Sequence, residues 1–161
     1  MLNKIRINSQ SEENSISIGK AIGTVIRSGD IITLVGNLGS GKTRLVKGII
    51  SQALAIPIDE IISPSFTLVN RYEGTMTIDH ADLYRVGPGA VEELGLLEII
   101  DAEGALLIEW ADNEAPVLKH ELRVTILYGM DPDFRFLNFE YEVPGAWETR
   151  LPRAVEKFQH S

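Results

Sequence analysis

One octapeptide, Gly36-Asn37-Leu38-Gly39-Ser40-Gly41-Lys42-Thr43, matches the pattern G-x-x-x-x-G-K-[S/T] at every fixed position. An unbroken aliphatic and β-branched run at 31–35 precedes it, which is typical of a strand covered on both faces. Apolar residues at three- and four-residue spacing follow it to about Ala55 and predict a helix that ends before Pro57. Strand, glycine-rich loop and helix are the context in which such a pattern binds phosphate.

This phosphate loop, residues 36–43, predicts a nucleotide site. Its glycines let successive backbone N–H groups point at an anion, and the helix that begins near Lys42 adds the positive end of its dipole. We expect Lys42 to reach the β- and γ-phosphates and Thr43 to place its hydroxyl on Mg²⁺. The loop residues expected to bind nucleotide are Asn37, Leu38, Gly39, Ser40, Gly41, Lys42 and Thr43.

A magnesium site beside such a loop also needs an acid, usually at the end of a neighbouring apolar strand. Glu109 directly follows the short apolar run 105–108. An isolated glutamate there is normally a solvated strand end, but its pairing with a phosphate loop favours a metal ligand. The predicted metal ligands are therefore Thr43 and Glu109.

Two further segments carry polar groups at expected strand ends: Ser-Pro-Ser-Phe-Thr at 63–67 and His-Ala-Asp-Leu-Tyr-Arg at 80–85. The Thr67 hydroxyl could sense a γ-phosphate, and Asp82 could act as a base or hold the water shell of the metal. The residues alone leave other interpretations open. Ser-Pro-Ser at 63–65 could simply begin a strand, Asp82 could cap a turn, and His80 could make a structural hydrogen bond. Arg85 could be a charge stabiliser or part of a surface ion pair.

The segment before the phosphate loop predicts a strand and then a helix. Ser9 and Glu12 have capping-box spacing, and the apolar face that follows extends to Gly29, which predicts a helix between them. Gly19 and Gly23 lie inside this pattern. Because glycine lowers intrinsic helicity, we expect these two positions to pack closely against a neighbouring element.

The remaining pattern predicts a sheet that mixes parallel and antiparallel strands. Alternation at 67–80 indicates a hairpin around Glu73-Gly74, and alternation at 122–128 and 134–141 indicates two more strands. Helices are expected at 91–100 and from Trp147 to Phe158. We predict an α/β, P-loop NTPase-like three-layer fold whose mixed central sheet includes an antiparallel hairpin.

Composition limits the function classes. The chain has 161 residues, enough for a single domain spanning 1–161, with 15 Lys and Arg against 23 Asp and Glu. The net charge of −8 disfavours a free-standing nucleic-acid binder, so DNA binding is not expected. The absence of cysteine excludes disulfides, thiolate zinc sites and cysteine nucleophiles. With neither a signal-peptide pattern nor an apolar run of about 20 residues, we expect a cytoplasmic protein that does not enter membranes.

In order and spacing, the phosphate loop and the segments 63–69, 80–85 and 108–110 (Ile-Glu-Trp) resemble the TsaE (YjeE) family of bacterial P-loop ATPases. The resemblance implies a mixed α/β fold and a cytoplasmic ATPase needed for threonylcarbamoyladenosine (t6A) modification of tRNA. It also implies action together with the proteins TsaD and TsaB, with tRNA contacted through that complex.

The resemblance implies roles for individual residues. Lys42 and Thr43 would be phosphate and Mg²⁺ ligands, Glu109 the second magnesium contact, and Asp82 a catalytically required residue. The segment 63–67 would be a switch loop that changes with the nucleotide, with Thr67 as its hydroxyl carrier.

Two further details of the resemblance concern Ser65 and the nucleotide base. Ser65 stands where the family usually has threonine, so it keeps the hydroxyl and loses a methyl group. The family's nucleotide base is adenine, which the absence of an [NT]-K-x-D guanine-reading pattern also favours, and Ser9 to Glu12 would lie near it. Catalytic roles are thus expected of Lys42, Asp82 and Glu109, and nucleotide contacts also of Ser9 and Thr67.

Three functional hypotheses remain open at this point. The first is an Mg²⁺-dependent ATPase with low activity until it joins its partners. The second is a small-molecule kinase of the P-loop class, which commonly needs a lid of arginines; Arg71 and Arg85 are the arginines considered for that role. The third is a nucleotide-dependent interaction module without important hydrolysis.

Overall fold

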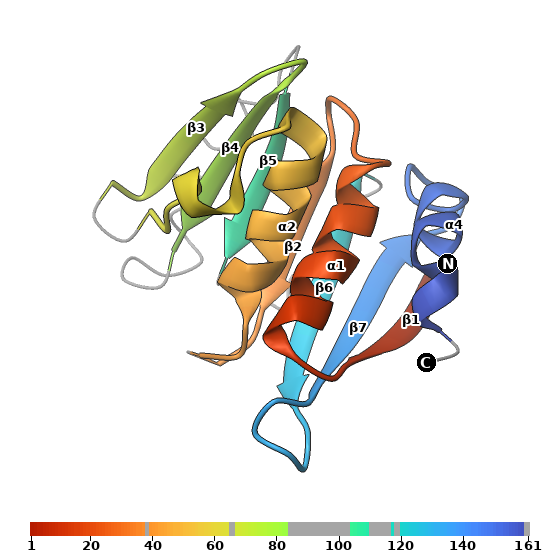
Figure 1. Ribbon diagram of the computed structural model, residues 1–161. Coiled ribbons are helices and arrows are strands. Elements are labelled where there is room, and N and C mark those ends of the chain that lie inside the picture. The colour runs from red at the N-terminus through yellow and green to blue at the C-terminus, as the bar shows by residue number, and fades with distance from the viewer. Residues whose placement is uncertain (38, 65–66, 84–103, 110–116, 118–119, 160–161) are drawn as a thin grey trace.

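The strands form one seven-stranded mixed sheet in the computed structural model, which describes residues 1–37, 39–64, 67–83, 104–109, 117 and 120–159. The strand order is β1-β7-β6-β2-β5-β4-β3 (Figure 1). The strands are β1 (Leu2–Ser9), β2 (Ile31–Val35), β3 (Val69–Glu73), β4 (Thr77–Asp82), β5 (Gly104–Glu109), β6 (Glu121–Tyr128) and β7 (Arg135–Glu142).

The central strands β6, β2, β5 and β4 are parallel, whereas β1, β7 and β3 each pair antiparallel with a neighbour. Every residue of β2 and of β5 is buried, as expected for strands covered on both faces. Because parallel strands share their carboxyl edge, the loop after β2 lies beside the ends of β4 and β5. The predicted mixed α/β architecture with an antiparallel hairpin, β3 to β4, is confirmed.

Helices α1 (Glu12–Gly23) and α2 (Lys42–Leu54) lie side by side over one face of the sheet (Figure 1). Glycines bring their backbones together. A Cβ atom at Gly19 would overlap the carbonyl oxygen of Leu45, and one at Gly48 would overlap that of Ile16. A Cβ at Gly23 would lie 2.5 Å from a backbone oxygen of α2. The close packing predicted for Gly19 and Gly23 is confirmed, and Gly48 is its counterpart on α2.

The predicted start and end of the first helix are wrong. Ser11 is the N-cap and accepts a hydrogen bond from the Asn14 N–H at 3.0 Å. Ser9 instead belongs to β1, where pairing with Arg135 of β7 keeps its backbone extended. The helix ends at Gly23, and Gly29 forms part of the following turn with φ of 91°. Capping-box spacing is a local pattern, and pairing of β1 with a distant strand overrides it.

The C-terminal segment is folded around a buried tryptophan. The closing helix begins at Arg150 instead of Trp147: α4 (Arg150–Val155) is followed by a short 3₁₀ turn, η3 (Glu156–Phe158). Pro152 lies in the first turn of α4, where the missing N–H costs no hydrogen bond. Trp147 precedes the helix and is fully buried. The helix expected at 91–100 lies outside the described residues.

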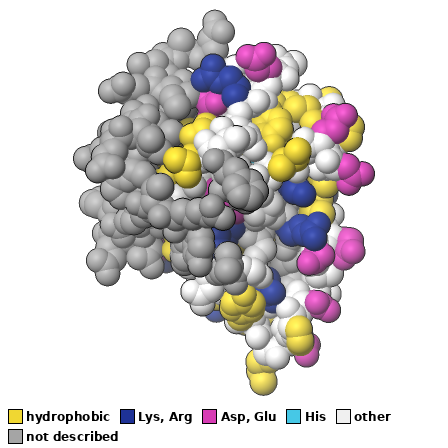
Figure 2. All heavy atoms as spheres, turned by 90° about the vertical axis from the view of Figure 1, so that its left-hand side faces the viewer, with side chains coloured by type: hydrophobic (Ala, Val, Ile, Leu, Met, Phe, Trp, Pro, Cys, Tyr) yellow, Lys and Arg dark blue, Asp and Glu magenta, His cyan; other side chains and the backbone are white. Residues whose placement is uncertain are grey.

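Charged side chains of both signs are interspersed over the described part of the face seen from the β3 side (Figure 2). They form no continuous basic field on that part of the surface. Among the helices that the structure describes, none has the length and apolar character needed to cross a membrane.

Candidate nucleotide-binding site

The phosphate loop has the backbone conformation that its glycines allow. Gly39 and Gly41 have φ of 81° and 104°, in the left-handed region that residues with a Cβ rarely adopt. Gly41 is the N-cap of α2 and supplies no side chain to its first N–H groups. Those groups stay available to a phosphate, which the helix dipole also favours.

Lys42 points back into the loop. Its Nζ donates hydrogen bonds to the carbonyl oxygens of Gly36, at 2.8 Å, and Asn37, at 3.0 Å. Burial lowers the pKa of Lys42 below its ordinary value, and the nearby carboxylates of Glu109 and Asp82 only partly oppose this shift. The ammonium is thus partly desolvated and has the carboxylates of Glu109 and Asp82 nearby.

Glu109 bridges the phosphate loop and β4. Its Oε1 accepts a hydrogen bond from the Thr43 hydroxyl at 3.0 Å, and its Oε2 lies 2.5 Å from Nε2 of His80. His80 is fully buried and Glu109 is 2% exposed. The structure therefore brings the two predicted metal ligands, Thr43 and Glu109, into direct contact.

The described residues include no group of three or more His, Asp or Glu side chains that could hold a metal by themselves. A hydroxyl and a carboxylate at the start of α2 are hard oxygen donors of the kind that Mg²⁺ prefers. They suit a metal that also binds phosphate oxygens and water, as magnesium at such loops does.

Asp82 lies at the end of β4, directly opposite Glu109 in the parallel register. Its charge acts on Lys42, and its backbone N–H donates to the carbonyl oxygen of Leu68 at 2.9 Å. Leu68 has φ of 67°, an unusual conformation for a residue with a branched side chain. Asp82 is thereby connected to the predicted switch segment as well as to the site.

The switch segment is only partly described. The Thr67 side chain is exposed, and its hydroxyl donates to Oδ1 of Asn70 at 2.6 Å, so the structure shows it engaged within its own loop. Ser65, Arg85 and Leu38 lie outside the described residues. Lys42, Thr43, Asp82 and Glu109 are therefore brought together, and Thr67 is not shown to join them.

Two buried side-chain polar atoms have no hydrogen-bond partner in the described part of the chain: Oγ of Ser40 and Nδ1 of His80. Both belong to this site, one in the phosphate loop and one beside Glu109. Buried polar atoms without partners are uncommon and are often found where a ligand or a reaction uses them. Their location supports the same site as the loop geometry.

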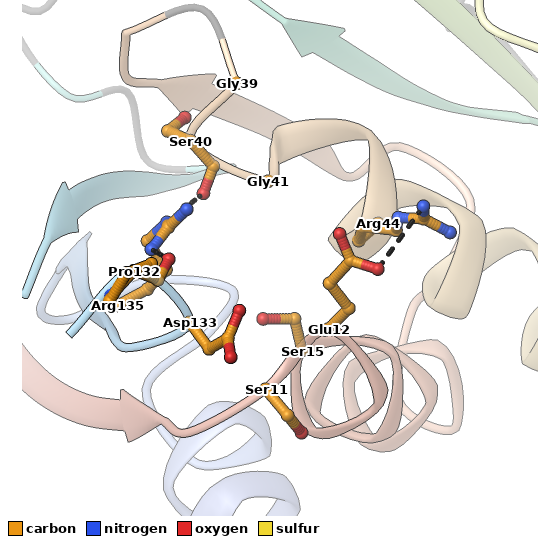
Figure 3. A pocket seen from close by; sticks show the side chains of 10 residues that line it. All are labelled: Ser11, Glu12, Ser15, Gly39, Ser40, Gly41, Arg44, Pro132, Asp133 and Arg135. Carbon is orange, nitrogen blue, oxygen red and sulfur yellow. Dashed lines mark hydrogen bonds and ion pairs between the residues drawn. The ribbon is translucent and has the colours of Figure 1, made fainter.

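A pocket adjoins the phosphate loop, between the start of α1, the start of α2 and the turn that joins β6 to β7 (Figure 3). Ser15 and Asp133 point toward each other across it. At its rim, Arg44 and Glu12 form an ion pair at 3.4 Å. The pocket combines carboxylates, hydroxyls and two guanidinium groups, those of Arg44 and Arg135, and so offers both donors and acceptors.

Arg135 joins the β6–β7 turn to the phosphate loop. Its Nε donates to the carbonyl oxygen of Ser40 at 3.0 Å, and its guanidinium lies over the ring of Tyr128, 4.4 Å from the centroid. One of its terminal nitrogens donates to the carbonyl oxygen of Phe134 at 2.9 Å. These contacts fix one wall of the pocket.

Sequence reasoning missed Arg44, which directly follows Thr43 but matches no fixed position of the motif. It also missed Asp133 and Arg135, which only the strand register brings to the loop. The segment from Ser9 to Glu12, which the family resemblance places near the nucleotide base, contributes Ser11 and Glu12 to the lining of this pocket, whereas Ser9 does not line it. Ser9 is fully buried, and its hydroxyl lies 2.6 Å from that of Ser15 and donates to the carbonyl oxygen of Ser11.

Comparison with known proteins agrees with this geometry. The model of the family described as threonylcarbamoyl adenosine biosynthesis protein TsaE matches residues 9–133. The chain belongs to the TsaE family. A TsaE protein of Nostoc is 37% identical over 125 residues, which cover 73% of this chain and 75% of the relative. One from Treponema pallidum is 36% identical over 126 residues, covering 76% and 89%.

A solved structure extends the similarity beyond the matched segment. The crystal structure of YdiB from Bacillus subtilis superimposes on this TsaE-family chain with a TM-score of 0.72 at 28% identity. It covers 99% of this chain and 97% of its own. The similarity to YdiB thus extends to strand β7 and helix α4, which follow residue 133.

Proposed function

We propose that this chain binds ATP with Mg²⁺ and hydrolyses it in support of t6A modification of tRNA, within a complex with TsaD and TsaB. The observation that carries the proposal is the contact of Thr43 with Glu109 beside Lys42, at the mouth of a phosphate loop. Membership of the TsaE family supports the biological role.

The phosphates would be held by the loop and by Lys42. The N–H groups of the loop and of the first turn of α2 would bind the phosphate oxygens, and Lys42 would exchange its two carbonyl partners for phosphate oxygens. Negative phosphate charge would offset the desolvation that lowers the Lys42 pKa. Lys42 would therefore both bind the phosphates and stabilise the charge that develops on them during the reaction.

Thr43 and Glu109 would hold Mg²⁺ through their hydroxyl and carboxylate oxygens, the donor type this ion prefers. When bound, the ion supplies neutralisation of the charge that develops on the transferred phosphoryl group. Asp82 would orient the attacking water and accept its proton, because it lies beside Glu109 and its charge reaches Lys42.

The pocket beside the loop would receive the nucleoside. Glu12 and Asp133 are acceptors suited to ribose hydroxyls and to the exocyclic amine of adenine, and Ser15 offers a hydroxyl. Arg135 would keep this wall in place through Ser40.

Hydrolysis is favoured over transfer to a small-molecule acceptor. A kinase of this class commonly needs arginines that close over the transferred group. Arg71 instead forms a two-bond pair with Asp79, at 2.9 and 3.1 Å, on the β3–β4 hairpin.

ATP turnover measured with and without TsaB and TsaD tests the proposal. We expect turnover to rise when both partners are added and to be lost in Glu109→Ala. Glu156→Ala is the matched control, because this exposed glutamate lies in η3, far along the chain from the site. Failure of the chain to bind nucleotide, or full turnover in Glu109→Ala, would overturn the proposal.

A further inference from the structure

The contact between His80 and Glu109 is built from two side chains that are both removed from solvent. His80 is fully buried in β4 and Glu109 is 2% exposed at the end of β5. Their 2.5 Å contact uses Oε2 of the carboxylate, whereas Oε1 faces the Thr43 hydroxyl. The two oxygens of Glu109 thus have different partners, one on each side.

We propose that His80 is a positioning residue of this site: it holds Glu109 so that the carboxylate and the Thr43 hydroxyl stay together as one magnesium-binding pair. The inference rests on the proposed nucleotide and Mg²⁺ function, and it assigns a role to a residue for which sequence spacing left both a functional and a structural interpretation open. His80 acts through Glu109 and does not itself touch phosphate or metal.

The hydrogen-bond pattern assigns the direction of this contact. A carboxylate only accepts, so Nε2 of His80 carries the proton and donates it to Oε2. In this tautomer Nδ1 has a lone pair and no proton, and it is the buried atom that lacks a partner. A buried lone pair without a donor is a smaller penalty than an orphaned N–H, which suits the assigned tautomer.

A purely structural explanation accounts poorly for this arrangement. The interior around β4 and β5 is aliphatic, with Ile78, Ala105 and Leu107 fully buried. An apolar side chain at position 80 would avoid a half-satisfied imidazole, and replacing a buried polar pair by apolar groups is often neutral or stabilising. The polar pair is therefore explained by what it does for Glu109.

Restricting Glu109 matters because a glutamate has several rotatable bonds. With Oε2 held by His80, rotation that would carry Oε1 away from Thr43 breaks a buried hydrogen bond. A metal ion that binds Thr43 and Glu109 would then find the threonine hydroxyl oxygen and Oε1 of the carboxylate already in position. Partners of this kind typically change metal affinity or activity 10–100-fold when removed.

The test compares His80→Phe, which keeps a ring of similar size but no donor, with His80→Gln, whose amide nitrogen can take the place of Nε2. Three quantities are measured: the affinity for ATP without metal, the affinity of the ATP complex for Mn²⁺ by electron paramagnetic resonance, and kcat with TsaB and TsaD present. In His80→Phe we expect unchanged metal-free ATP affinity, about 10-fold or more weaker Mn²⁺ binding and about 10–100-fold lower kcat. His80→Gln should recover a large part of both losses.

Two controls separate positioning from folding. Ile78→Val removes a buried methyl group from the same strand and should leave the Mn²⁺ affinity and kcat unchanged. In a Glu109→Gln background, His80→Phe should cause no further loss, because its effect passes through that carboxylate. If His80→Phe does not fold, His80→Asn replaces it, since its shorter amide cannot reach Oε2 and should not recover metal affinity.

The inference is overturned by wild-type Mn²⁺ affinity in His80→Phe, by equal losses with and without Glu109, or by His80→Gln performing no better than the variant without a donor. Failure of the unaltered chain to bind ATP at all would overturn the proposed function instead, so the two outcomes are distinguishable.

Discussion

Asp30 and Glu109 are both buried carboxylates at the ends of neighbouring central strands, with 3% and 2% of their surface exposed. Their partners differ in kind. Asp30 precedes β2 and is held by Arg150 through two hydrogen bonds of 2.7 and 2.8 Å. Glu109 ends β5 and is held by His80 and Thr43, each of which has a further role to play in the proposed site.

The Asp30 pair is complete in itself. Arg150 also donates to the carbonyl oxygens of Ala146 and Val25, and its guanidinium lies over the Trp147 ring, 4.2 Å from the centroid. Asp30 in addition accepts from the Arg27 N–H. The geometry fastens the C-terminal helix to the turn between α1 and β2, so we assign this pair to stability.

The Glu109 group is incomplete by comparison. Nδ1 of His80 lacks a partner, and Lys42 beside it is partly desolvated. Asp30 precedes β2 and Glu109 ends β5. Because these two strands are parallel, the two carboxylates lie at opposite ends of the strands. Equal burial therefore does not mean equal function: the Asp30 pair has its partners within the fold, whereas the group around Glu109 includes an imidazole nitrogen without one.

The largest expected effect is on stability. Arg150→Leu leaves the Asp30 carboxylate buried without its cation and should lower the free energy of unfolding by about 3–5 kcal/mol. Urea denaturation measures the loss, and adding Asp30→Asn to the same chain should restore part of it. Turnover per folded molecule should stay at the unaltered level; a loss of turnover in the folded fraction would break the distinction between the two carboxylates.

The next effect is on activity. Glu109→Gln keeps the size of the side chain and its acceptor oxygen but removes the charge that would hold Mg²⁺, so kcat with TsaB and TsaD should fall about 100-fold. The free energy of unfolding should change by less than about 1 kcal/mol, since few contacts are lost. If the free energy of unfolding fell and turnover did not, Glu109 would be a structural carboxylate like Asp30.

A smaller effect is expected from the helix layer. Gly48→Ala places a methyl group against the backbone of α1 and should cost about 1–3 kcal/mol by overpacking. Gly29→Ala is the matched control, because nothing lies within 4 Å of that position and only its φ of 91° is unfavourable, about 1 kcal/mol. Thermal unfolding compares the two, and an equal loss would show that close helix packing contributes little.

The smallest effect concerns the start of α1. Ser11→Ala removes the N-cap hydrogen bond to Asn14 and should lower the free energy of unfolding by about 1 kcal/mol. Ser17→Ala is the matched control, because this exposed serine lies inside α1 and its hydroxyl donates only to the carbonyl oxygen of Glu13 in the same helix. Hydrogen exchange of the α1 amides compares the two variants, and an equal loss of helix stability would show that Ser11 does not act as the cap.

Much of the site follows from sequence because its signals are local or topological. The phosphate loop is contiguous, and Asp82 and Glu109 end neighbouring parallel strands whose carboxyl ends share one edge of the sheet. Arg135 and Asp133 were not predictable, since the β7 register alone brings their turn to the loop. The start of α1 was misplaced because pairing of Ser9 with β7 outweighs a local capping pattern.

The contact of His80 with Glu109 shows the other limit of sequence reasoning. Strand positions place the two residues near one edge, but only the side-chain geometry shows that both carboxylate oxygens are engaged and that one imidazole nitrogen is not. Spacing therefore predicted Glu109 as the acid and left the role of His80 open.

Calorimetric titration of Mg²⁺·ATP into the unaltered chain and into Lys42→Ala tests the central claim most directly. We predict saturable binding to the unaltered chain and its loss in Lys42→Ala, because the loop keeps its amides but loses the cation that meets the phosphates. Equal affinity in the two proteins, or no binding to the unaltered chain, would contradict the account.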